Sequence, residues 1–195
     1  MFGLYQRVRR LRLKRRAEAA PIPAARWAAT IAELPVLAGL THEERARLHR
    51  LASLFLHDKI FEPAGGMRLD DAARTRIAAL AALPILGLDY GWYDGWRTII
   101  VYPGSFVRPR SQFDDIGVQH EWEEILTGES WELGPVVLSW ADVEASGQGE
   151  GYNVVVHEMA HKLDMRNGPR TVSHPSPGAS TAAPGPPISA PPSRT

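Results

Sequence analysis

The hydrophobic pattern of this chain predicts a helix directly after Thr41. Thr41 and Glu44 have the spacing of a capping box, in which each side chain bonds the backbone N–H of the other residue. The apolar residues that follow share one helical face: Leu48, Leu51, Leu54 and Phe55. We expect this helix to bury that face and to end near His57, which we interpret as a helix-end group.

A second helix is predicted from Asp70 or Asp71, either of which can cap it, as far as Pro84. Its many alanines allow neighbouring elements to pack closely against it. Residues 1–20 are interpreted as a basic helical lead-in.

Two later segments have strand patterns. Arg97–Tyr102 contains three consecutive apolar β-branched residues, which predicts a strand buried on both faces. In Trp131–Val143, the residues Val136, Leu138 and Trp140 alternate with others, which predicts a strand with two unlike faces. Helices and strands together indicate an α+β fold.

The segment with the most chemical content lies beyond these strands. His157, Glu158 and His161 form an H-E-x-x-H sequence, and Asn153 is a candidate N-cap for its helix. Residues four apart share a helical face, so both imidazoles can reach one metal ion. Glu158 can then take a proton from a water on that metal. Apolar neighbours indicate a buried helix whose polar side chains point inward and need a partner, and the alternative is a surface helix whose charged residues face water.

A catalytic zinc ion normally has three protein ligands and a water molecule. The extended H-E-x-x-H-x-x-G-x-x-H pattern is excluded, because Asp164 and Asn167 occupy the Gly and last His positions. Nothing in the spacing singles out a third ligand among the remaining candidates: His120, Glu121, Glu123, Glu124 and His174.

A complete site would hydrolyse peptides by a defined route. Zinc would acidify its water and polarise the scissile carbonyl, while Glu158 acts as general base and passes the proton to the leaving amine. An edge strand near the metal could hold the peptide by strand addition, and Val136–Trp140 is our candidate for that strand.

Composition and charge limit the size, the cellular compartment and the binding partners that we expect for this chain. The 195 residues suffice for one medium domain, and the absence of Cys excludes disulfides and Cys-type zinc sites and suits the cytoplasm. No apolar run approaches the roughly 20 residues of a membrane span, and a net charge of zero predicts no binding to membrane or directly to nucleic acid. Residues 7–16 carry seven Lys or Arg, which we interpret as a solvated helix end, with a nucleic-acid or lipid contact as the alternative.

The composition changes after Gly168. Residues 169–195 hold eight of the sixteen prolines and no Asp or Glu, so this tail is expected to be disordered. The predicted organisation is therefore a lead-in over 1–20, a domain over 21–168 and the tail.

The residues Val154–Gly168 resemble the zinc-site helix of the MtfA (Mlc titration factor A) family of bacterial zinc-dependent peptidases. The resemblance covers residues 1–168 and includes four other segments: 55–59, 77–79, 100–103 and 137–140. It implies a zincin-like fold, a cytoplasmic aminopeptidase-type metallopeptidase and binding of the repressor Mlc. It also implies His157 and His161 as zinc ligands and Glu158 as catalytic base.

The family pattern continues past Asn167-Gly168 with further helices, one of which carries a Glu as third ligand. That part is absent here, so we expect a truncated or frameshifted member whose zincin-like domain lacks its C-terminal part. Three hypotheses follow: a zinc peptidase, a regulatory protein that sequesters a Mlc-type repressor, and a catalytically inactive fragment.

Overall fold

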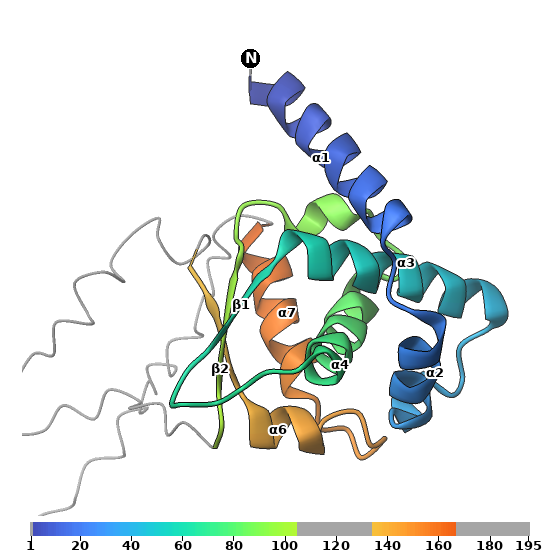
Figure 1. Ribbon diagram of the computed structural model, residues 1–195, viewed down its shortest axis with the longest axis vertical. Coiled ribbons are helices and arrows are strands. Elements are labelled where there is room, and N and C mark those ends of the chain that lie inside the picture. The colour runs from blue at the N-terminus through green and yellow to red at the C-terminus, as the bar shows by residue number, and fades with distance from the viewer. Residues whose placement is uncertain (1, 105–133, 167–195) are drawn as a thin grey trace, which may run out of the picture.

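The computed structural model describes residues 2–104 and 134–166 (Figure 1). In this part of the chain, helices pack against one small sheet, so the fold is α+β as predicted. The tail beyond Gly168 lies outside the described residues, and the predicted domain boundaries stay predictions.

The helix α4, Asp71–Ala82, lies at the centre of the molecule and is buried along most of its length (Figure 1). It packs against α2, Ala24–Ala32, against α3, His42–Asp58, and against α7, Val154–Arg166. The carboxylate of Asp70 caps it by accepting a hydrogen bond of 2.8 Å from the backbone N–H of Ala73. The predicted start of this helix is confirmed.

The capping box of α3 is also confirmed. The backbone N–H of Glu44 donates to Oγ1 of Thr41 at 3.2 Å, and the backbone N–H of Thr41 donates to Oε2 of Glu44 at 2.8 Å. The predicted apolar stripe of this helix faces the core, and the helix ends at Asp58. Nε2 of His57 lies 2.7 Å from the carbonyl oxygen of Ala20, as expected for a helix-end group.

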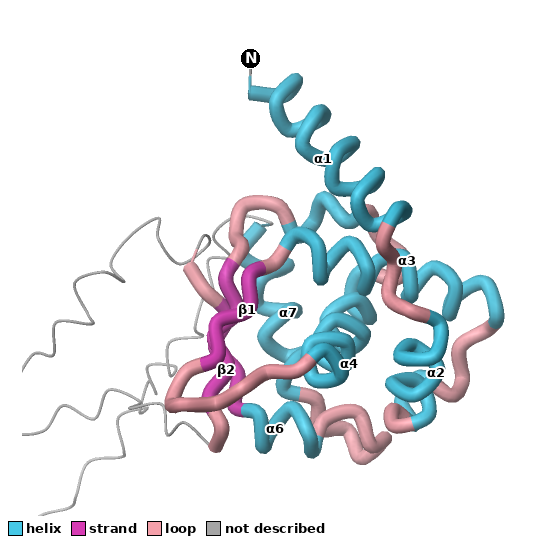
Figure 2. The backbone as a smooth tube through the Cα atoms, in the orientation of Figure 1, coloured by secondary structure: helices cyan, strands magenta, loops and turns pink. Residues whose placement is uncertain are grey.

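Three parallel strands form the sheet in the order β1-β2-β3 (Figure 2). They are β1, Ile60–Pro63, β2, Thr98–Tyr102, and β3, Val136–Ser139. The prediction that β2 is buried on both faces is wrong, because only Ile99 and Val101 are buried and their neighbours are half-buried. The described helices lie on one side of this sheet (Figure 2).

The strand predicted within Trp131–Val143 ends at Ser139, and the residues from Trp140 onward form a helix instead. The hydroxyl of Ser139 accepts a hydrogen bond of 3.3 Å from the backbone N–H of Asp142 and caps α6, Trp140–Ala145. A hydroxyl used in this way begins a helix, which accounts for the shorter strand. The alternation predicted over Val136–Leu138 is confirmed.

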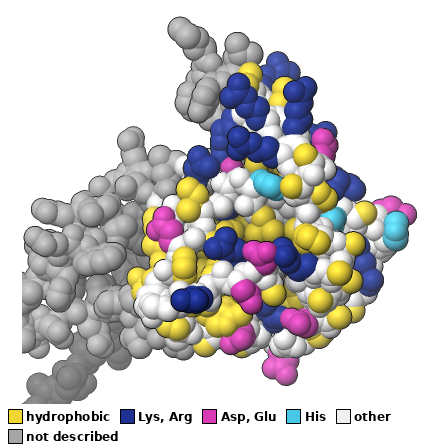
Figure 3. All heavy atoms as spheres, in the orientation of Figure 1, with side chains coloured by type: hydrophobic (Ala, Val, Ile, Leu, Met, Phe, Trp, Pro, Cys, Tyr) yellow, Lys and Arg dark blue, Asp and Glu magenta, His cyan; other side chains and the backbone are white. Residues whose placement is uncertain are grey.

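The basic lead-in forms α1, Phe2–Ala19, which extends from one end of the body (Figure 1). Lys and Arg side chains gather at this end of the surface (Figure 3). Short 3-10 turns complete the described chain: η1, Pro35–Leu37, η2, Leu83–Ile85, and η3, Tyr90–Tyr93. Among the described residues, no helix is long and apolar enough to cross a membrane.

Candidate metal centre

The H-E-x-x-H sequence lies on α7, whose start is fixed by two hydrogen bonds. The side chain of Asn153 accepts a bond of 3.0 Å from the backbone N–H of Val156, which confirms Asn153 as the N-cap. The backbone N–H of the next residue, Val154, donates to the hydroxyl of Ser146 at 2.9 Å. The loop before α7 therefore fixes where the helix begins.

The buried stripe of α7 consists of Val155, Met159 and Lys162. His157 and His161 lie two residues beyond Val155 and Met159, which places them about 200° around a helix of 3.6 residues per turn. Both histidines are accordingly exposed, and Glu158 is half-buried. The prediction that these polar side chains point into the core is wrong for the two histidines, because the valine and methionine take the inner face.

The two imidazoles converge on one point. Their Nε2 atoms are 3.1 Å apart, the ring centroids are 4.5 Å apart, and the rings are inclined at 86°. Two nitrogens bound tetrahedrally to zinc at about 2.0–2.1 Å would lie about 3.3–3.4 Å apart. The pair therefore fits two ligand positions of a tetrahedral metal site.

The described residues hold no group of three His, Cys, Asp or Glu side chains that could bind a metal ion. The upstream candidates His120, Glu121, Glu123 and Glu124 fall within 105–133, and His174 falls within 167–195. All five lie outside the described residues, so the structure does not choose among these candidates for the third ligand.

Lys162 is a feature of the site that the sequence reasoning missed. It is 9% exposed, and its ammonium donates a 2.7 Å hydrogen bond to the carbonyl oxygen of Gly134, two residues before β3. The ammonium also lies 5.6 Å from the ring centroid of Trp96. Burial lowers the pKa of Lys162, and the nearby Glu158 carboxylate opposes that shift. The only sequence signal was the Glu158–Lys162 spacing of four residues.

The other end of α7 is fixed by Arg166. Its guanidinium donates to the carbonyl oxygen of Gly91 and lies 3.5 Å from that of Asp94. The carboxylate of Asp94 is in turn bonded by Arg9 and Arg10 of α1. Both ends of the helix that carries the histidines are thus tied to other elements.

An H-E-x-x-H pair that converges on the exposed face of a core-packed helix, within a mixed helix and sheet fold, is typical of metallopeptidases. Residues 8–181 match the family model described as glucose-regulated metallo-peptidase M90, and the chain belongs to that family.

Curated relatives carry the name Mlc titration factor A. The chain is 43% identical to the protein of Cronobacter sakazakii over 79% of its own length and 57% of that relative. It is 42% identical to the protein of Enterobacter sp. over 78% of its length and 57% of the relative. It is 44% identical to the protein of Escherichia fergusonii over 70% of its own length and 52% of that relative. The chain thus spans little more than half the length of these relatives and belongs to the family its sequence resembles.

Proposed function

We propose that the chain belongs to a zinc-dependent peptidase in which Nε2 of His157 and Nε2 of His161 hold the metal. The observation that carries the proposal is their separation of 3.1 Å on the open face of α7. Zinc fits this donor set, because imidazole nitrogens are among its preferred ligands and the spacing suits its tetrahedral geometry. When bound, zinc supplies Lewis-acid chemistry and makes a water molecule more acidic.

Glu158 is the proposed general base. It accepts a proton from the attacking water and passes it to the leaving amine, which is the role its position beside the first histidine allows. Lys162 lies beside it and binds the backbone just before β3. β3 is an outer strand in the order of the described sheet, so it supports the proposal that a peptide adds alongside this strand. Aminopeptidase specificity and a cytoplasmic setting remain proposals drawn from the family resemblance.

Metal content and cleavage test this proposal separately. We expect the full chain to bind zinc and to lose it in His157→Ala and His161→Ala, with His42→Ala, an exposed histidine at the start of α3, as the matched control. In a peptide-cleavage assay, Glu158→Gln should lower the rate about 10²-fold or more while zinc stays bound. Zinc that stays bound in both histidine variants would refute the ligand assignment. Zinc binding without any Glu158-dependent cleavage would favour the repressor-sequestering protein or the catalytically inactive fragment.

The name of the relatives favours a second function. A protein called Mlc titration factor A is named for an effect on Mlc, so we also propose that the chain sequesters a repressor of the Mlc type. Co-purification of the full chain with purified Mlc tests it, with Glu158→Gln as the variant that separates binding from hydrolysis. Capture of Mlc by both forms would support sequestration without cleavage, and failure of both would refute it.

A further inference from the structure

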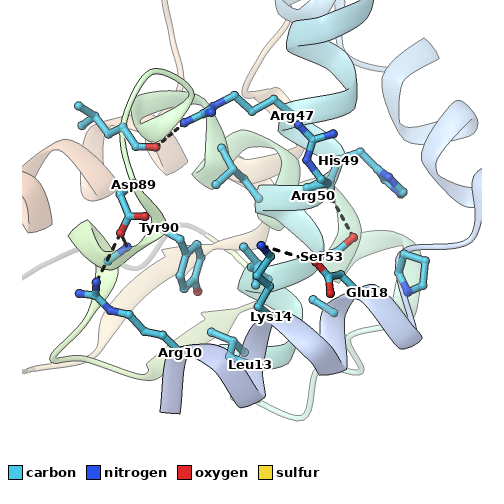
Figure 4. Close-up of a pocket in the computed structure, with 16 residues that line it drawn as sticks. Arg10, Leu13, Lys14, Glu18, Arg47, His49, Arg50, Ser53, Asp89 and Tyr90 are labelled. Carbon is cyan, nitrogen blue, oxygen red and sulfur yellow. Dashed lines mark hydrogen bonds and ion pairs between the residues drawn. The ribbon is translucent and has the colours of Figure 1, made fainter. Parts of the chain in front are cut away.

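A cavity of about 560 Å³ lies between α1, α3 and the segment Leu88–Gly91 (Figure 4). This volume lies within the range of about 300–1,000 Å³ that is usual for small-molecule sites. None of its lining residues belongs to α7, so the cavity is distinct from the candidate metal centre.

The floor of this cavity is apolar. Three of its residues are almost sealed from solvent: Leu13, Ala17 and Leu51, which are 9%, 5% and 6% exposed. The polar atoms beside them are satisfied within the protein, since the hydroxyl of Tyr90 donates to Asp58 at 3.1 Å and that of Ser53 donates to the carbonyl of His49 at 2.8 Å. An occupant that buries apolar surface on this floor therefore meets no unsatisfied polar group there.

The rim is charged and predominantly positive. It carries four cationic side chains and two carboxylates: Arg10, Lys14, Arg47, Arg50, Glu18 and Asp89. Two of the cations are already engaged, because Arg10 bonds Asp94 at 2.8 Å and Arg47 bonds the carbonyl of Leu88 at 2.8 Å. The other two cations, Lys14 and Arg50, are available to contact an occupant of the cavity.

Lys14 and Arg50 lie at the mouth of the cavity on different helices (Figure 4). The only ion pair of Lys14 with a described residue is a long one, 3.9 Å to Glu18. Arg50 forms neither a hydrogen bond nor an ion pair with any described residue. A guanidinium with free donors is suited to bind a carboxylate through two parallel hydrogen bonds.

We propose that this cavity binds a small amphiphilic monocarboxylate. Its aliphatic or aromatic body lies on the floor formed by Leu13, Ala17 and Leu51, and its carboxylate lies between Arg50 and Lys14. The excess of positive charge at the rim selects an anion over a cation with the same body. Small hydrophilic anions gain less on binding, because they have little apolar surface of their own to bury in the cavity.

Isothermal titration of the full chain with sodium decanoate, below its micelle concentration, tests the proposal. We expect one saturable site for decanoate and much weaker binding of decyltrimethylammonium, which has the same tail and the opposite charge. Acetate, which keeps the carboxylate and lacks the tail, should not bind detectably. Equal binding of the two ten-carbon amphiphiles, or no binding of decanoate, would overturn the proposal.

Variants locate the site. Arg50→Glu and Lys14→Glu should each weaken decanoate binding, with Arg50→Glu costing about tenfold or more. Arg12→Glu makes the same change on an exposed face of α1 outside the cavity and should leave the affinity unchanged. Ala17→Trp should block the site by filling it. Since Arg50 and Lys14 are exposed, their variants keep the fold and decide the question even where Ala17→Trp unfolds the protein. An equal loss of decanoate affinity in Arg50→Glu and Arg12→Glu would refute a site at Arg50.

Discussion

Asp58 and the His157–His161 pair are both polar groups on helices of one core, yet their surroundings are opposite. Asp58 is 3% exposed and binds Arg9, Lys59 at 2.9 Å and the hydroxyl of Tyr90 at 3.1 Å. The histidines are exposed, and their Nε2 atoms face each other at 3.1 Å.

This difference separates a structural cluster from a ligand site. The charges around Asp58 are satisfied within the protein, as buried charges must be. The ammonium of Lys59, for example, also donates to the carbonyls of Tyr93 and Trp96 at 2.6 and 2.8 Å. The Nε2 atoms of the two histidines face each other, so an added metal ion could bind both of them. Each region therefore predicts a different response to mutation.

The largest effect is expected for Asp58→Ala. Removing this carboxylate leaves Lys59 and Arg9 without their buried partner, so the free energy of unfolding should fall by about 3–5 kcal/mol. Urea denaturation followed by circular dichroism measures this loss. Glu18→Ala, which removes an ion pair whose carboxylate is 61% exposed, is the control and should change stability by at most about 1 kcal/mol. Equal losses in the two variants would erase the distinction between the regions.

The pH dependence of stability tests the buried cluster in another way. Burial, opposed by Asp58, lowers the pKa of Lys59 to about 8. Above this pKa the folded chain has released a proton that the unfolded chain still binds, so stability contributed by this group rises with pH. The slope is about 1.4 kcal/mol per pH unit at most.

We expect Lys59→Met to lack this rise in urea denaturation between about pH 8 and pH 9.5. The window stops there because the raised pKa values of Tyr90 and Tyr93 act in the opposite direction: their unfolded forms lose protons near pH 10 and stability falls. A wild-type curve that runs parallel to that of Lys59→Met would show that Lys59 titrates normally in the folded protein.

The sequence predicted the parts of this fold that depend on local chemistry. The caps at Thr41, Asp70 and Asn153 were found because each involves a side chain and a backbone N–H three residues away. β1 was missed, because four residues with little pattern become a strand only by pairing with β2, distant in the sequence.

The candidate site was predictable to a similar extent. The convergence of two imidazoles follows from helical spacing, and the structure has it. The buried face of α7 could not be predicted from the sequence. Valines and a methionine lie on more than one side of the histidines, so packing against the rest of the protein decides which of them are buried. The bond from Lys162 to Gly134 joins two elements, so no local signal could reveal it.

A smaller effect is expected for Lys162→Met, which keeps the aliphatic stem and removes the ammonium. Loss of the charged hydrogen bond to Gly134 should destabilise the protein by about 1–3 kcal/mol. Because this bond holds the chain just before β3, hydrogen exchange of the β3 amides should also accelerate. Lys14→Met, at a side chain 68% exposed, is the control for both measurements. Unchanged exchange in β3 would show that Lys162 does not hold this strand.

The smallest effect on the metal-free protein is expected at the histidines themselves. His157→Ala and His161→Ala remove exposed side chains, so after treatment with a chelator their free energies of unfolding should lie within about 0.5 kcal/mol of the wild type. Added zinc should then raise the melting temperature of the wild type and of neither variant, because a ligand stabilises only the state that binds it. A metal-free variant that is strongly destabilised would place the histidines in the same class as Asp58, as structural groups. Stabilisation by zinc that survives both substitutions would place the metal elsewhere in the chain.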